Sequence, residues 1–151
     1  IAQCLVGSEM CIRDRLYSQE LVKEFQKEIE RWRPDIIMPV PLHPSRKRKR
    51  GYNQAQILAE EIGKILEIPV DSKSLIRTRK TSPQKKLGHQ ERKKNLKHAF
   101  AVKHTFQAVK RVLLVDDIYT TGNTIDAVSN VLKQKGVENV YFLTISIGQG
   151  Y

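Results

Sequence analysis

The stretch VLLVDDIYTTGNT, which runs from Val112 to Thr124, decides the fold. Its first four residues are large and apolar, a short continuous run typical of a strand that is buried on both faces. Two carboxylates, Asp116 and Asp117, follow at the point where such a strand reaches the surface. In an open α/β sheet, ligands bind at the carboxyl ends of the strands, beside the N-termini of the helices that follow. The stretch therefore predicts a ligand site as well as a strand.

A turn rich in small hydroxyl residues follows the acids and leads into a helical pattern. Its backbone N–H groups and hydroxyls are suited to binding one phosphate. Because carboxylates repel a phosphate, an acid pair beside this turn favours a ligand that also carries hydroxyl groups, such as a sugar phosphate. The alternative is an ordinary strand–turn–helix unit in which Gly122 only marks the turn.

The stretch resembles the phosphoribosyl-pyrophosphate (PRPP) motif of the type I phosphoribosyltransferases, which is a buried strand, two acids, two variable residues and Thr-Thr-Gly-x-Thr. The resemblance implies that Asp116 and Asp117 form the catalytic pair, which holds the ribose 2′- and 3′-hydroxyls, and that one of them is a candidate base toward an incoming nucleobase. It also implies Mg²⁺ as the cofactor, held through PRPP and water without a direct protein ligand. The residues implied for ribose and 5′-phosphate binding are Asp116, Asp117, Thr120, Thr121, Gly122, Asn123 and Thr124.

Helical and strand patterns alternate along the rest of the chain. Apolar residues at spacings of four, four and three predict a helix that runs from Leu16 to the stop at Pro34, and a second helix begins near Asn53. A third helix follows the motif. The predicted strands cover residues 35–40, 74–77, 99–102, 112–115 and 139–147. This alternation, together with the resemblance, predicts an α/β, type I phosphoribosyltransferase-like fold, with a mostly parallel central sheet flanked by helices.

A second informative stretch, PVPLHPSRKRKRGYNQA, covers residues 39–55 and places a cationic loop after the first predicted strand. Five consecutive positive charges suit a pyrophosphate. The Pro-Leu-His-Pro turn and the Arg-Gly-Tyr-Asn-Gln run resemble the ComF family, a phosphoribosyltransferase-like branch linked to DNA uptake. Lys47 and Lys49 are expected to be solvated. The residues implied for the pyrophosphate loop are Pro41, Leu42, His43, Arg50 and Asn53.

A third stretch runs from Leu75 to Phe100, and its part between Thr78 and Lys97 is polar and basic and has no clean period. Long connections of this kind are usually functional lids or disordered segments. The spacing of its residues again resembles the ComF family, which implies a flexible hood that closes over the substrates and excludes water. The implied hood residues are Arg77, Arg79, Gln84, Arg92 and Asn95.

Composition and charge narrow the function classes. The 151 residues suit one domain, and the net charge of +11 predicts affinity for polyanions. Residues 46–50 and 73–97 together hold 15 of the 27 lysines and arginines, so the charge forms two patches. Two cysteines exclude a four-thiolate zinc site within this chain. No apolar run reaches the roughly 20 residues of a membrane span, so no span and a cytoplasmic location are expected.

The first fifteen residues contain CLVGSEMCIRDR, which resembles translated adapter read-through. We therefore expect residues 1–15 to be a non-native leader and residues 16–151 to form the phosphoribosyltransferase-like domain. ComF relatives usually carry a cysteine-rich, zinc-binding segment upstream, and this chain has no counterpart of it.

The resemblance implies a PRPP-binding protein linked to DNA uptake and competence, which either transfers the 5-phosphoribosyl group with Mg-pyrophosphate as the leaving group or binds PRPP without transfer. The alternative is a non-catalytic, single-stranded-DNA-handling competence protein that reuses the fold. The two basic patches favour this alternative, whereas the lack of interleaved aromatic residues other than Tyr52 opposes it. The expected partners are PRPP or a nucleotide, single-stranded DNA or DNA-uptake proteins, and a second copy of the chain. The acceptor base is not readable from the sequence.

Overall fold

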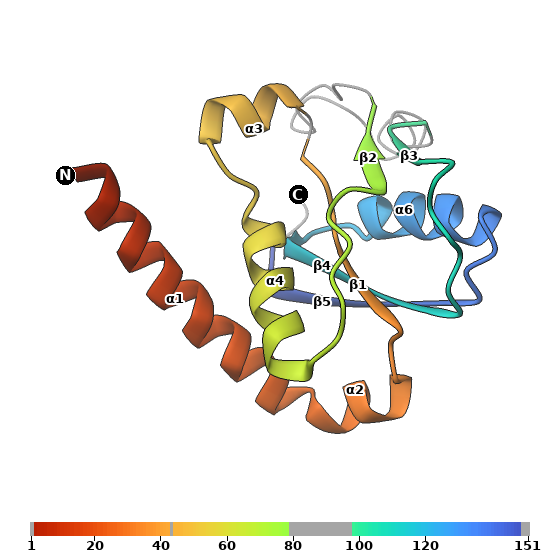
Figure 1. Ribbon diagram of the computed structural model, residues 1–151, viewed down its shortest axis with the longest axis horizontal. Coiled ribbons are helices and arrows are strands. Elements are labelled where there is room, and N and C mark those ends of the chain that lie inside the picture. The colour runs from red at the N-terminus through yellow and green to blue at the C-terminus, as the bar shows by residue number, and fades with distance from the viewer. Residues whose placement is uncertain (1, 43, 79–97, 149–151) are drawn as a thin grey trace.

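Three parallel strands form the central sheet in the order β1, β4, β5, as Figure 1 shows. The computed structural model describes residues 2–42, 44–78 and 98–148, with the backbone alone for residues 2–11 and 46. The central strand, β4, pairs Leu114 with Met38 on one side and with Phe142 on the other. The strands are β1 (Ile36–Pro39), β2 (Leu75–Arg77), β3 (Phe100–Val102), β4 (Arg111–Tyr119) and β5 (Asn139–Ile147). The helices are α1 (Ala2–Glu24), α2 (Gln26–Trp32), α3 (Pro44–Arg50), α4 (Gln54–Leu66) and α6 (Asn123–Gln134).

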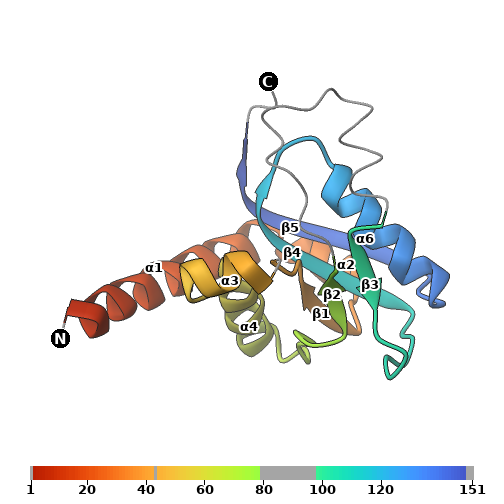
Figure 2. The same ribbon diagram turned by 90° about the horizontal axis from the view of Figure 1, so that it is seen from above.

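Alternating side chains of the strands build one core on each face of the sheet. Val112 and Leu114 pack with the apolar face of α6 and with β2 and β3. Leu113 and Val115 pack on the other face with α2 and α4. Figure 2 shows this layering, with α6 on one side of the strands and α1 and α4 on the other. The run that the sequence predicted to be buried on both faces is therefore fully buried, and the predicted α/β fold with a parallel sheet between helices is confirmed.

The strand that carries the acid pair is longer than the sequence predicted. β4 continues through Asp116 and Asp117 to Tyr119 because β5 pairs beside it as far as Ile147. The prediction that the strand ends at Val115 was wrong, since cross-strand pairing and not local apolar content sets its length. The acids therefore have the fixed backbone of a strand.

Three short elements outside the central sheet, β2, β3 and α3, add to or correct the sequence predictions. Strands were expected near residues 75 and 100 without an assigned partner, and β2 and β3 pair antiparallel with each other in a separate two-stranded sheet. The basic run was expected to be a loop, but α3 makes it a helix that ends at Arg50. The N–H of the following residue, Gly51, donates to the Lys47 carbonyl at 2.7 Å. Gly51 has φ +81, a conformation that glycine adopts without strain.

The first helix begins earlier than predicted. α1 runs without interruption through residues 2–24, and its Asp14 and Ser18 are fully buried. The Gln54 amide donates to the Asp14 carboxylate, which joins α1 to the start of α4. The expectation that residues 1–15 are a non-native leader stays a prediction. Within the part of the chain that the structure describes, no helix is long and apolar enough to cross a membrane.

Candidate functional site

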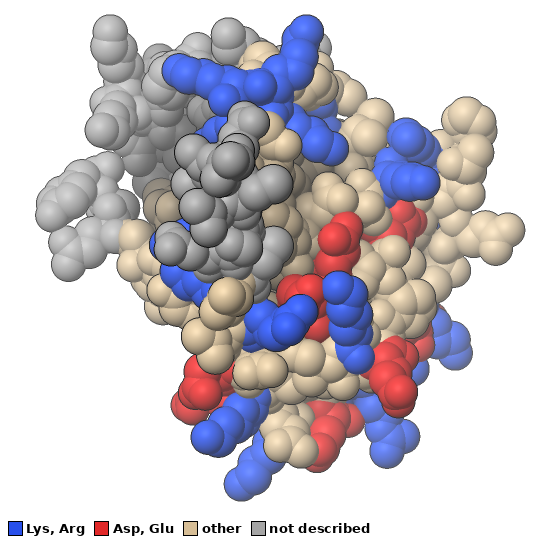
Figure 3. Space-filling view, turned by 60° about the vertical axis from the view of Figure 1, so that its left-hand side comes forward, with Lys and Arg blue, Asp and Glu red and all other residues tan. Residues whose placement is uncertain are grey.

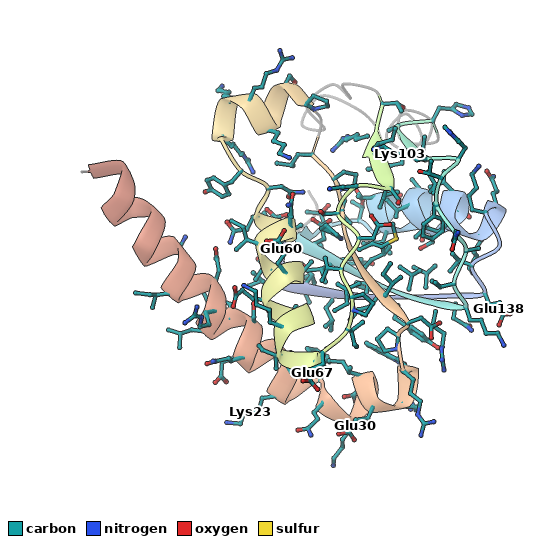
Figure 4. The ribbon with its side chains drawn as sticks, viewed as in Figure 1. Lys23, Glu30, Glu60, Glu67, Lys103 and Glu138 are labelled. Atoms are coloured by element: carbon teal, nitrogen blue, oxygen red, sulfur yellow. The ribbon has the colours of Figure 1, made fainter. Side chains whose placement is uncertain are left out.

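A cleft of about 230 Å³ opens at the carboxyl ends of β1 and β4. It brings together three segments that are far apart in the sequence: the β1–α4 connection, β2, and the acid pair with its turn. The lining residues are Val40, Pro41, Leu42, Arg50, Asn53, Arg77, Asp116, Asp117, Ile118, Thr120 and Thr124. Nine of these eleven residues are among the site residues that the sequence predicted. Figure 4 shows that this region, below α3, is crowded with side chains from several elements.

The acid pair is the electrostatically costly part of the cleft. Burial, followed by the hydrogen bond and the like charge of Asp117, together raise the pKa of Asp116 to about 7. The nearby Arg77 charge opposes this rise, and the Asp117 backbone N–H donates to the Asp116 carboxylate at 2.8 Å. The ionised form of Asp116 is stabilised by any ligand that brings hydroxyl donors or a cation to it.

The turn after the acids leads directly into α6. Gly122 is the N-cap with φ +75, and no side chain caps the helix. First-turn N–H groups have no partner within a helix, so this end of α6 attracts an anion. Asn123 is 8% exposed, and its Nδ2 has no acceptor among the described residues. Thr120 and Thr124 line the cleft, whereas Thr121, Gly122 and Asn123 do not.

Two arginines face the acids across the cleft. Arg50 is the last residue of α3, and Arg77 is the last residue of β2, with its guanidinium 5.3 Å from the Phe100 ring centroid. In Figure 3, Lys and Arg side chains gather at the top of the molecule, where α3 lies. Lys47 and Lys49 are exposed and do not line the cleft, as the sequence predicted. The cleft therefore has a cationic wall and an anionic wall.

Asn53 lines the cleft, but both ends of its amide are bound to backbone. Its Nδ2 donates to the Val40 carbonyl and its Oδ1 accepts from the Ala55 N–H, each at 3.1 Å. This caps α4 and fixes it to the loop after β1. Asn53 therefore shapes the wall, while the direct ligand contact that the sequence predicted for it stays a prediction.

The sequence analysis missed two lining residues, Val40 and Ile118. Ile118 is 51% exposed although it lies in a strand beside two half-buried carboxylates. The sequence signal that could have identified Ile118 as a lining residue is its place as an apolar residue between the acids and the turn. Several predicted residues lie outside the described part of the chain: His43, Arg79, Gln84, Arg92 and Asn95.

The donor chemistry of the cleft fits Mg²⁺ that is bound mainly through a ligand. No group of three or more His, Cys, Asp or Glu side chains able to hold a metal occurs among the described residues. Two carboxylates and two threonine hydroxyls instead offer the few oxygen donors that a hydrated Mg²⁺ uses beside phosphates.

Comparison with known proteins places the chain in a family. Residues 23–146 match the phosphoribosyl transferase domain model, so the chain belongs to the phosphoribosyl transferase domain family. It is 40% identical over 109 residues to competence protein F of Haemophilus influenzae, which covers 71% of this chain and 48% of that protein. It is 36% identical over 107 residues to the DNA utilization protein YhgH of Shigella flexneri, which covers 71% and 47%. The predicted resemblance to the ComF family is confirmed.

The chain spans about half the length of the curated relatives it matches. Among solved structures, a purine phosphoribosyltransferase of Pyrococcus horikoshii superposes with a TM-score of 0.54 at 17% identity, covering 87% of this chain and 73% of that one. A Thermus thermophilus protein superposes with a TM-score of 0.52 at 13% identity, covering 91% and 85%. At these identities the superpositions support the fold alone.

Proposed function

We propose that the cleft binds PRPP with Mg²⁺ and that the protein transfers the 5-phosphoribosyl group, with pyrophosphate as the leaving group. One observation carries the proposal: the acid pair, two threonines at the entrance to α6, and two arginines line one cleft. A ligand that carries hydroxyls between two phosphate groups would find partners among these side chains. The names of the relatives add an expected role in competence or DNA utilization.

Each wall of the cleft has a separate task in this proposal. Asp116 and Asp117 accept hydrogen bonds from the ribose hydroxyls, which favours the ionised form of the pair. Thr120, Thr124 and the first turn of α6 hold the 5′-phosphate. Arg50 and Arg77 stabilise the charge on the departing pyrophosphate. Because both phosphate-bearing ends of PRPP are held in place, the reacting carbon between them is aligned. If Mg²⁺ is held with PRPP beside Asp116 and Asp117, it would supply charge neutralisation for the pyrophosphate.

Calorimetric titration with Mg-PRPP tests the proposal. In the double variant Asp116→Asn, Asp117→Asn, the affinity should fall at least about 100-fold, because two hydrogen-bonded charges are removed. The matched control is Glu67→Gln, Glu138→Gln, which changes the net charge by the same two units at exposed positions, well away from α3 in Figure 4. Its affinity should equal that of the wild type. Unchanged affinity in the first variant would refute the site assignment.

Transfer is tested separately from binding. Release of pyrophosphate from Mg-PRPP is measured with a panel of nucleobases as acceptors. Release with one base, lost in the Asp116, Asp117 double variant, supports a transferase. Binding without release for any base supports a PRPP-binding protein that lacks transferase activity.

A second function, binding of single-stranded DNA, is favoured by α3. This helix carries five consecutive basic residues and no acid, and Lys47, Arg48 and Lys49 are exposed. Phosphate neutralisation by such a helix gives an affinity that falls steeply with salt. A salt titration with a fluorescent oligonucleotide tests this, and the absence of binding at low salt would eliminate it.

A further inference from the structure

Tyr119, the last residue of β4, lies between the acid pair and the hydroxyl-rich turn but does not line the cleft. Its ring stacks on Phe142 of β5, with ring centroids 5.4 Å apart and planes 13° from parallel. Stacking on the neighbouring strand fixes where this ring lies. The motif resemblance treats position 119 as variable and gives it no role.

The same ring lies against the backbone of the turn. A Cβ atom at Gly122 would be 2.8 Å from the Tyr119 Oη and 3.4 Å from its Cζ. Gly122 also has φ +75, which residues with a Cβ rarely adopt. Because Gly122 has no side chain, the Tyr119 side chain can pack directly against the backbone of the turn.

The backbone of Tyr119 is held as well. Its carbonyl accepts a hydrogen bond of 2.7 Å from the Gly148 N–H, just after β5. A Cβ atom at Gly148 would lie 3.0 Å from the Thr120 Cγ2, so the end of β5 and the start of the turn are in close contact. Both the ring and the carbonyl of Tyr119 therefore connect the turn to β5.

We propose that Tyr119 is a positioning residue for the 5′-phosphate of a sugar phosphate, an inference that rests on the proposed function. The ring keeps Thr120, Thr124 and the first-turn N–H groups of α6 at the spacing that one phosphate requires. Two contacts hold this side chain in place: the ring stacks on Phe142, and the hydroxyl end makes the closest approach to Gly122. The pyrophosphate end of the cleft, at Arg50 and Arg77, does not depend on this support.

Two ligands separate this role from a general effect on folding. Ribose 5-phosphate probes the turn, and inorganic pyrophosphate with Mg²⁺ probes the arginine wall. In Tyr119→Ala, affinity for ribose 5-phosphate should fall about tenfold, as expected for one or two misplaced hydrogen bonds to a charged group, while affinity for pyrophosphate stays unchanged. Tyr119→Phe, which keeps the stack on Phe142 and lacks the hydroxyl nearest to Gly122, should bind ribose 5-phosphate more tightly than Tyr119→Ala does.

The matched control is Tyr141→Ala. Tyr141 is on β5, next to Phe142, but it stacks on Trp32, with centroids 4.9 Å apart, on the opposite face of the sheet. Its loss should lower the melting temperature and leave both affinities unchanged. If Tyr119→Ala does not fold, Tyr119→Leu, which keeps apolar volume without the stack, replaces it.

Three results would overturn the inference. Equal affinity for ribose 5-phosphate in the wild type and in Tyr119→Ala would show that the ring does not position the turn. A parallel loss of both ligands would show a structural role only. If the wild type binds neither ligand, the proposed function fails and the inference fails with it. If the wild type binds both ligands, the proposed site stands, and the Tyr119 variants then test the positioning role by itself.

Discussion

An aspartate lies at each end of the central sheet, and the pKa values of these two aspartates are shifted in opposite directions. Before β1, Asp35 accepts from the Arg111 backbone N–H at 2.8 Å and from its guanidinium at 3.0 Å. The hydrogen bond from the Arg111 side chain is the main cause of a lowered Asp35 pKa. At the carboxyl end of β4, burial and Asp117 raise the pKa of Asp116 to about 7.

This difference separates a structural carboxylate from a ligand-binding one. Asp35 has its hydrogen-bond and charge partners within the fold, so it joins β1 to β4 and needs nothing else. Asp116 lies beside a second acid, Asp117, and its ionised form becomes favourable only when a ligand or a cation enters the cleft. Perturbed carboxylates of the second kind are typical of functional sites.

The largest expected effect is on the pH dependence of stability. Because the pKa of Asp116 is about 7 in the folded protein and 3.8 is its ordinary value, the folded state binds more protons between those values. Stability should therefore fall as the pH rises from about 4 to about 7. Asp116→Asn should remove that fall and be more stable at pH 8 by about 2–4 kcal/mol. Denaturant unfolding at several pH values measures this, and parallel profiles for both proteins would contradict it.

A second prediction concerns the cationic wall. Arg77→Ala should weaken Mg-PRPP binding about tenfold, because a charged partner of the pyrophosphate is lost. It should also raise the pKa of Asp116 further, since the Arg77 charge lowers it in the wild type. Lys23→Ala, at an exposed position on α1 (Figure 4), removes the same charge as a control. Equal affinities in these two variants would exclude Arg77 from the site.

The opposite end of the sheet should respond in stability alone. Asp35→Ala removes the two hydrogen bonds from Arg111, and the melting temperature should fall by about 2–4 °C. Because the Asp35 pKa is lowered in the folded protein, its contribution is present above pH 4 and is lost as the pH falls through the folded value. Affinity for Mg-PRPP should not change, and a loss of affinity would remove the contrast between the two aspartates.

The smallest effect is expected on the outer face of α3. Lys47→Ala together with Lys49→Ala should leave Mg-PRPP affinity unchanged, because neither side chain lines the cleft. The same variant should reduce the salt dependence of oligonucleotide binding if DNA binds α3. Weaker PRPP binding would extend the site beyond the cleft.

The sequence predicted what is local and missed what depends on distant partners. The acids, the turn and the buried run of β4 follow from adjacent residues, so VLLVDDIYTTGNT alone indicated strand, site and helix entrance. The pairing of β2 with β3 and the extension of β4 to Tyr119 depend on contacts between segments, which local propensity does not encode. The contact between Tyr119 and Phe142 also depends on distant residues. The two rings stack only because β4 and β5 are neighbouring strands of the sheet.

The measurement that tests the central claim most directly is a nuclear magnetic resonance titration of the wild type with ribose 5-phosphate. We predict that the backbone amide signals of residues 120–124 and the carboxyl signals of Asp116 and Asp117 shift together and saturate with a single dissociation constant. Shifts confined to residues 44–50, or different dissociation constants for the acids and the turn, would contradict a shared sugar-phosphate cleft.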